Sequence, residues 1–150
     1  MKSCKMIWCI VSFAAAAVAA AMAILVFLCN IRPAVVLSGS MEPEIMTGSL
    51  CFIDYKEKKA EVGDIIAYEK EDMRIIHRVS QKNDDEYITK GDNNDTEDIA
   101  PVHEKQIMGR ALFSLPYLGY SVMAMKTKAG FTVTAALIFT VLLSGFSVKK

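Results

Sequence analysis

The sequence predicts a mainly β fold, a small antiparallel barrel or sandwich with closed edges, flanked by two transmembrane helices. Two stretches, residues 6–31 and 129–148, contain no charged side chain. Each is long enough to cross a hydrocarbon core, which requires about 20 apolar residues. Residues 32–128 carry all 17 acidic side chains of the chain. Within this middle segment short apolar runs alternate with turn-forming residues, a pattern typical of strands.

Residues 1–31 are expected to form an N-terminal signal anchor. Lys2 and Lys5 precede the apolar stretch, as in a cleavable signal peptide. The apolar core of a signal peptide is about 7 to 15 residues long, and the uncharged stretch here continues well beyond that. A lipid anchor at Cys29 is disfavoured because the preceding residue, Leu28, is bulky. We therefore expect a retained transmembrane helix.

Residues 32–128 are expected to form an extracytoplasmic β-domain. Strands are predicted at residues 50–55, 64–68, 74–80, 86–89 and 107–113, and loops at residues 56–63, 69–72, 81–85 and 91–98. The loops are rich in Asn, Asp and Gly, which tolerate left-handed backbone and hydrogen-bond their own main chain. Cys51 is the one cysteine away from the first apolar stretch. No disulfide can therefore form within this domain, and its stability must come from its core.

The C-terminal part is expected to bend at residues 127–129 and to cross the membrane at residues 129–148. The positive-inside rule favours a cytoplasmic N-terminus, because Lys2 and Lys5 lie beside the first span. The chain is then a multi-pass protein of the cell (plasma) membrane with its middle domain outside. Its 17 basic and 17 acidic residues give no net charge. The lipid bilayer is thus an expected partner and nucleic acid is not, since phosphate binding requires clustered basic residues.

The segment from Ser38 to Pro43 contains a first candidate for chemistry. Two serines, Ser38 and Ser40, flank Gly39, and such a turn can expose a hydroxyl beside backbone N–H groups. Even fully extended, the chain from Leu28 to Ser40 spans at most about 40 Å, so Ser40 stays near the membrane surface. Taken alone, this segment also has the composition of an ordinary linker.

His77 is the second candidate, and an acidic loop supplies the third. Alternation along residues 73–79 places His77 on an apolar strand face. Histidine side chains titrate near pH 6.5 in general, which suits a general base at neutral pH. An Asp of the loop 90–98 can accept the second ring N–H of such a histidine. The residues leave open which of Asp92, Asp95 and Asp98 does so. A calcium site is disfavoured, because the twelve-residue loop pattern is absent, and His103 is expected to be solvated.

Four motifs in this order resemble the successive boxes of type I signal peptidases. They are Ser-Gly-Ser-Met-Glu-Pro at 38–43, Gly-Asp-Ile-Ile-Ala-Tyr at 63–68, Ile-His-Arg-Val at 76–79 and Thr-Lys-Gly-Asp-Asn-Asn at 89–94. The resemblance extends from Ala34 to about Tyr120. One branch of that family uses a Ser/Lys dyad, whereas the branch named for the endoplasmic reticulum has a histidine at the lysine position. This chain has His77 there and resembles the second branch.

The resemblance implies a role for each candidate residue. Ser40 is the nucleophile, His77 the general base and Asp98 the acidic partner, with Asp92 as a competing or supporting candidate. The Ser38 hydroxyl and the Ser40 backbone N–H are implied to bind the oxyanion. No cofactor and no metal are implied.

The resemblance also implies a membrane-bound serine endopeptidase. Its substrates are the signal peptides of exported precursors, which end in small residues of the Ala-x-Ala type. The chain departs from the family pattern at Gly48-Ser49, where members often have Gly-Asp. It also lacks a large insert between strands, so we expect a minimal enzyme.

Two alternatives remain at this point. A membrane-anchored extracytoplasmic β-domain that binds or scaffolds without catalysis explains the predicted topology, but not the order of the Ser, His and Asp boxes. A self-processing repressor requires a helical DNA-binding domain, which we do not expect here. The sequence names neither the precursors nor any partner subunit.

Overall fold

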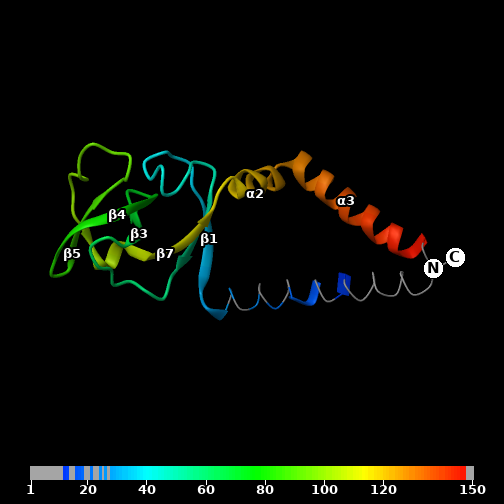
Figure 1. Ribbon diagram of the computed structural model, residues 1–150, viewed down its shortest axis with the longest axis horizontal. Coiled ribbons are helices and arrows are strands. Elements are labelled where there is room, and N and C mark those ends of the chain that lie inside the picture. Colours follow the sequence, from blue (N-terminus) through cyan, green and yellow to red (C-terminus); the bar gives the residue numbers. More distant parts are fainter. Residues whose placement is uncertain are drawn as a thin grey trace.

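The computed structural model describes residues 28–147 and, before them, residues 12–13, 16–18, 21, 24 and 26. The described chain forms one seven-stranded sheet in which every neighbouring pair is antiparallel, with the order β1-β2-β7-β3-β4-β5-β6 (Figure 1). The strands are β1 (Ile31–Val35), β2 (Leu50–Asp54), β3 (Ile65–Lys70), β4 (Met73–Asn83), β5 (Glu86–Lys90), β6 (Val102–His103) and β7 (Ile107–Leu115). The prediction of a mainly β, antiparallel fold is confirmed.

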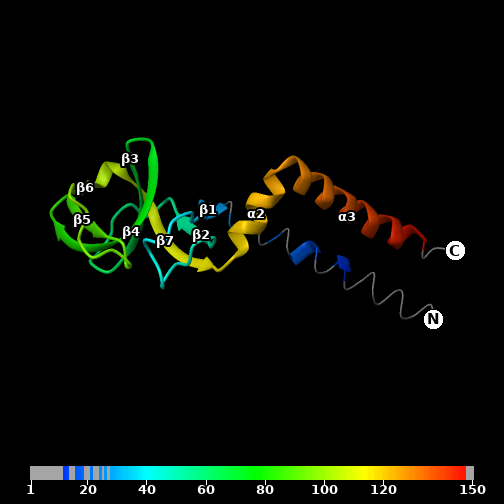
Figure 2. The same ribbon diagram turned by 90° about the horizontal axis from the view of Figure 1, so that it is seen from above.

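The sheet has two edges, β1 and β6, so the prediction of a barrel or sandwich with closed edges is corrected. The long strand β7 explains the shape. Its first half pairs with β3 and its second half with β2, and the register shifts once in each pairing. Such bulges bend a strand and increase its twist, and the sheet curves accordingly (Figure 2).

Apolar side chains form a core on each face of the sheet. Alternation along β3 sends Ile66 and Tyr68 to one face and Ile65 and Ala67 to the other. The first core consists of Ala60, Ile66, Tyr68, Val79, Tyr87, Val102 and Ile107. The second consists of Val36, Met41, Ile45, Cys51, Ile53 and Ala67. Of the candidate site residues, His77 lies on a strand of this sheet, whereas Ser40 and Asp98 lie in loops.

All five predicted strands are present, with some differences in their limits. Strand β4 continues to Asn83 through residues expected to lie in a loop, and the turn comes at Asp84, whose φ is 45°. Strand β1 was not predicted because it contains Pro33, which cannot donate to a strand ladder. Proline is tolerated in an edge strand such as this one. Strand β6 is only two residues long, too short to leave a pattern.

Two helices follow the sheet, namely α2 (Leu118–Lys126) and α3 (Lys128–Ser147). A short 3-10 helix, η1 (Glu104–Gln106), precedes β7. Thr127 has extended backbone between α2 and α3, within the predicted bend, and α3 extends away from the sheet (Figure 1). No helix among the described residues has both the length and the hydropathy needed to cross a bilayer. The first predicted span falls mostly outside those residues. The two predicted spans are therefore not confirmed.

Candidate active site

Ser40 lies in the loop that connects β1 to β2, and several contacts fix this loop. The backbone of Val36 is bonded on both sides, donating to Ser49 O at 2.9 Å and accepting from Gly48 N at 2.8 Å. Met41, the residue after Ser40, is 1% exposed and anchors the turn in the second core. The Ser40 side chain itself remains partly exposed. The loop thus presents one hydroxyl at the surface on a fixed backbone.

His77 lies on β4, a strand that has β3 on one side and β5 on the other. It pairs with Ile66 of β3 and is buried, with 8% of its surface exposed. The predicted alternation is present, since Ile75 and Val79 contribute to the first core while Ile76 packs against the second. A histidine held on a central strand has little freedom to move, so its two ring nitrogens point in fixed directions.

Asp98 follows β5 in a loop that folds back onto that strand. Its backbone N–H donates to Thr89 O at 2.8 Å. Its side chain returns to the same residue, because Thr89 Oγ1 donates to Asp98 Oδ2 at 2.6 Å. This double attachment places the carboxylate beside β4.

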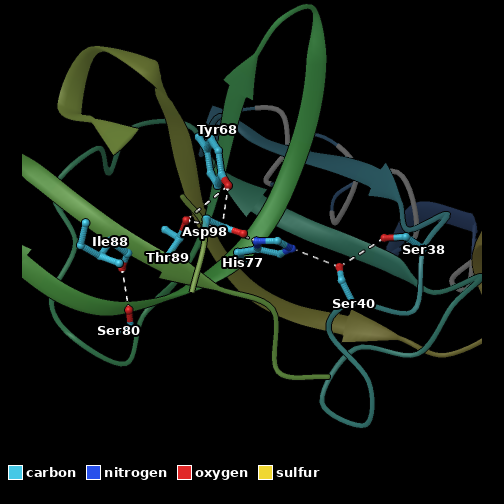
Figure 3. A network of polar contacts seen from close by, with 8 residues as sticks. All are labelled: Ser38, Ser40, Tyr68, His77, Ser80, Ile88, Thr89 and Asp98. Carbon is cyan, nitrogen blue, oxygen red and sulfur yellow. Dashed lines mark hydrogen bonds and ion pairs between the residues drawn. The ribbon is translucent and has the colours of Figure 1, made fainter. Parts of the chain in front are cut away.

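The three side chains form a continuous hydrogen-bonded row (Figure 3). Asp98 Oδ2 lies 2.7 Å from His77 Nδ1, and His77 Nε2 lies 3.2 Å from Ser40 Oγ. The sequence separates these partners by 21 and 37 positions, so the row exists only in the folded chain.

The environment of Asp98 fixes the direction of the hydrogen bonds. Burial alone opposes ionisation of this carboxyl, but hydrogen bonds from Thr89, His77 and Tyr68 hold its pKa below its ordinary value of 3.8. An ionised carboxylate accepts hydrogen bonds and donates none. Nδ1 of His77 must therefore carry the proton, which leaves Nε2 of the neutral ring as the acceptor for the Ser40 hydroxyl.

The other two candidate aspartates do not contact His77. Asp92 accepts two hydrogen bonds from Arg78, from Nε at 2.9 Å and from Nη2 at 2.7 Å. Asp95 is exposed. Of the three acidic residues that the sequence left open, the structure brings Asp98 to the imidazole.

The Asp92 loop instead contacts the backbone of the candidate nucleophile. The N–H of Asn93 donates to Ser40 O at 2.8 Å. A Cβ atom at Gly91 would lie 2.6 Å from the same oxygen, so only glycine permits this approach. Arg78, the residue after His77, therefore fixes this loop to β4 through Asp92. The loop in turn fixes the backbone of Ser40 through Asn93.

Ser38 lies beside the candidate nucleophile, with its Oγ 3.3 Å from Ser40 Oγ. The backbone N–H of Ser40 has no hydrogen-bond partner within residues 28–147. A hydroxyl and a free N–H next to an attacking oxygen are suitable donors for a developing oxyanion.

Comparison with known proteins places the chain in a family. Residues 33–112 match the family model described as Peptidase S24-like. The chain belongs to this family. The matched segment begins in β1, ends in β7 and includes Ser40, His77 and Asp98.

Curated relatives specify the branch of this family. The chain is 41% identical to the signal peptidase complex catalytic subunit SEC11 of Eremothecium gossypii, over 57% of this chain and 60% of that protein. It is 33% identical to SEC11 of Candida tropicalis, over 65% of this chain and 67% of that protein. It is 36% identical to human SEC11C, over 61% of this chain and 56% of that protein. The resemblance to type I signal peptidases of the endoplasmic reticulum type is confirmed, and the chain spans about three fifths of the length of these relatives.

Two residues that hydrogen-bond Asp98 were not identified from the sequence. Tyr68 and Thr89 both donate to Asp98 Oδ2, at 3.1 and 2.6 Å. They stand in two of the four motifs, but Tyr68 ends an apolar run and Thr89 lies in a predicted strand. The sequence pattern therefore does not distinguish a functional hydroxyl at these two positions from an ordinary strand residue.

Proposed function

We propose that this chain is a membrane-bound serine endopeptidase that removes N-terminal signal peptides from exported precursors. One observation carries the proposal, namely the row in which Ser40 Oγ faces His77 Nε2 at 3.2 Å while His77 Nδ1 faces Asp98 at 2.7 Å. The names of the relatives support the same activity. Ser40 is assigned as nucleophile, His77 as general base and Asp98 as the residue that orients it. Asp92 is assigned a supporting role through Arg78.

The proposed mechanism follows from the directions of the hydrogen bonds. His77 Nε2 takes the proton of the Ser40 hydroxyl as the oxygen attacks a peptide carbonyl, and Asp98 stabilises the imidazolium that forms. The tetrahedral intermediate collapses to an acyl-enzyme when the imidazolium gives its proton to the leaving amine. Water, activated by the same imidazole, then releases the signal peptide.

The chain termini are proposed to place this chemistry at a membrane surface. Residues 6–31 and 129–148 are assigned as transmembrane spans, and residues 32–128 as the extracytoplasmic catalytic domain between them. Holding enzyme and precursor at one interface raises their effective concentration. Because the relatives are named as subunits of a signal peptidase complex, association with partner subunits in a cellular membrane is part of the proposal.

Replacing Ser38 with Ala is expected to slow cleavage without abolishing it. Loss of one oxyanion donor typically costs about 10²- to 10³-fold in kcat, and the Ser40 N–H remains. Initial rates on a fluorescent precursor measure the effect. Ser80→Ala is the matched control, because the Ser80 hydroxyl donates to Ile88 O at 3.1 Å and lies outside the row. An unchanged rate for Ser38→Ala contradicts the oxyanion assignment.

Activity is expected to disappear on the acidic side of neutrality while the protein stays folded. The base accepts a proton only when its imidazole is neutral. The pKa of Asp98, in contrast, is held below 3.8 by its hydrogen-bond donors despite the opposing effect of burial. A carboxyl with a depressed folded-state pKa stabilises the fold above its unfolded pKa, and this stability is lost only as the pH falls through the folded value. Initial rates and circular dichroism over one pH series test whether activity is lost at a higher pH than the folded structure. Loss of both signals at the same pH contradicts this prediction.

The proposed function is tested by precursor cleavage in liposomes that contain the full chain. A precursor with an Ala-x-Ala site should be cut after the last small residue, as mass spectrometry of the products will show. The same precursor with a bulky residue at that position should remain intact. If the folded wild-type chain cuts neither precursor, in liposomes or in the membranes of cells that make it, a non-catalytic tethered β-domain is the better account.

A further inference from the structure

The Asp98 carboxylate is held by more than the catalytic histidine. Its Oδ2 atom accepts from Thr89 Oγ1 at 2.6 Å and from the Tyr68 hydroxyl at 3.1 Å, in addition to His77 Nδ1 at 2.7 Å (Figure 3). Tyr68 and Thr89 are 2% and 0% exposed. Neither hydroxyl can exchange its partner for bulk water. The two hydroxyls lie 3.3 Å from each other, and both also lie within hydrogen-bond distance of Asp98 Oδ2.

The sheet itself places these two donors. Strand β4 lies between β3 and β5. His77 pairs with Ile66 of β3, and Tyr68 lies two residues further along β3 on the same face. Val79, two residues after His77, pairs with Thr89 of β5. The base and both donors therefore share one face of three adjacent strands, and only Asp98 comes from a loop.

We propose that Tyr68 and Thr89 are positioning residues that act through Asp98. They align Asp98 Oδ2 with His77, and they limit how strongly the carboxylate stabilises the protonated imidazole. The inference rests on the proposed function of Ser40 and His77. A carboxylate oxygen that already accepts two hydroxyl protons presents less negative charge to a third partner. The imidazolium formed during catalysis is then stabilised enough to form and still able to release its proton to the leaving group.

The surroundings support an effect confined to this network. Within residues 28–147, no charged side chain other than Asp98 forms a hydrogen bond or an ion pair with His77, and the neighbouring Arg78 directs its guanidinium to Asp92. The Tyr68 ring meets the imidazole edge-on, with 6.4 Å between centroids. Burial is the main cause that raises the pKa of Tyr68 to about 12, so its hydroxyl keeps its proton at neutral pH.

Tyr68→Phe and Thr89→Val remove the two hydroxyls with little change of shape. Each is expected to lower kcat about tenfold with little change in KM. Each is also expected to move the acidic midpoint of the pH–rate profile to higher pH. Without one of its hydroxyl donors, the Asp98 carboxylate stabilises the protonated form of His77 more strongly. Thr89→Ser keeps the hydroxyl and should restore both values.

The controls are two hydroxyl deletions in the same part of the sheet. Tyr87→Phe alters another buried tyrosine of the first core, and Ser80→Ala removes a hydroxyl that donates to Ile88 O. Both should leave the midpoint in place. Thermal unfolding of every variant identifies any that fail to fold, and Tyr68→Phe alone decides the outcome if Thr89→Val does not fold. An unchanged midpoint in folded Tyr68→Phe and Thr89→Val protein overturns the proposal.

A second measurement does not depend on cleavage. The chain has only two histidines, His77 and His103, so the imidazole signals of the ¹⁵N-histidine-labelled protein in detergent can be assigned with a His103→Gln variant. The titration midpoint of His77 should rise in Tyr68→Phe and Thr89→Val. A rise in a protein that cuts no precursor supports the network and contradicts the proposed function. A wild-type chain that cuts precursors, with no rise in either variant, contradicts the network alone.

Discussion

Replacing Ser40 with Ala is expected to lower kcat for precursor cleavage by about a millionfold, and replacing His77 with Ala should cost about as much. The double variant should be no slower than either single variant. The physical reason is that the hydroxyl, 3.2 Å from His77 Nε2, is a weak nucleophile without its base, and the base has no function without the hydroxyl. Single-turnover rates on a fluorescent precursor in liposomes measure all three variants.

Ser80→Ala and His103→Gln are the matched controls, because both residues lie outside the row and His103 is exposed on β6. Neither should change kcat. Rapid cleavage by the folded His77→Ala protein shows that another group is the base. A double variant whose loss equals the product of the two single losses contradicts a shared proton transfer.

Asp98→Asn is expected to lower kcat by about 10⁴-fold. An amide at this position can point its NH₂ group at His77 Nδ1, which favours the ring tautomer with the proton on Nε2. That proton then faces Ser40 Oγ and prevents the ring from accepting. The loss should therefore appear in kcat with little change in KM, while the melting temperature falls because the ionised carboxylate that accepts from Thr89 and Tyr68 is lost.

The same substitution at the other two aspartates tests the assignment. Asp92→Asn weakens a bidentate contact with Arg78, and we expect a loss of about tenfold in kcat together with a lower melting temperature. Asp95→Asn changes an exposed side chain and should have no effect. A larger loss for Asp92→Asn than for Asp98→Asn would assign the orienting role to Asp92.

Much of the fold could be predicted because strands leave a local pattern. The five predicted strands are short apolar runs bounded by Asn, Asp and Gly, and each is present in the sheet. The same locality explains the errors. Pro33 interrupts the sequence pattern expected of a strand in β1, and the polar residues 81–83 at the end of β4 also lack that pattern. The end of β4 is stabilised by pairing with β5 and not by its own composition. The open sheet could not be predicted, since it depends on how β7 divides its length between β2 and β3.

The sequence by itself determined that a serine turn, a histidine on an alternating strand and an acidic loop follow one another, because each depends on a few neighbouring residues. Only the tertiary structure decided that Asp98 faces His77 while Asp92 faces Arg78. It also decided that the hydroxyls of Tyr68 and Thr89 meet the same carboxylate oxygen. These choices depend on strand register and on the path of one loop, which bring together side chains many positions apart, and no local pattern encodes such distances.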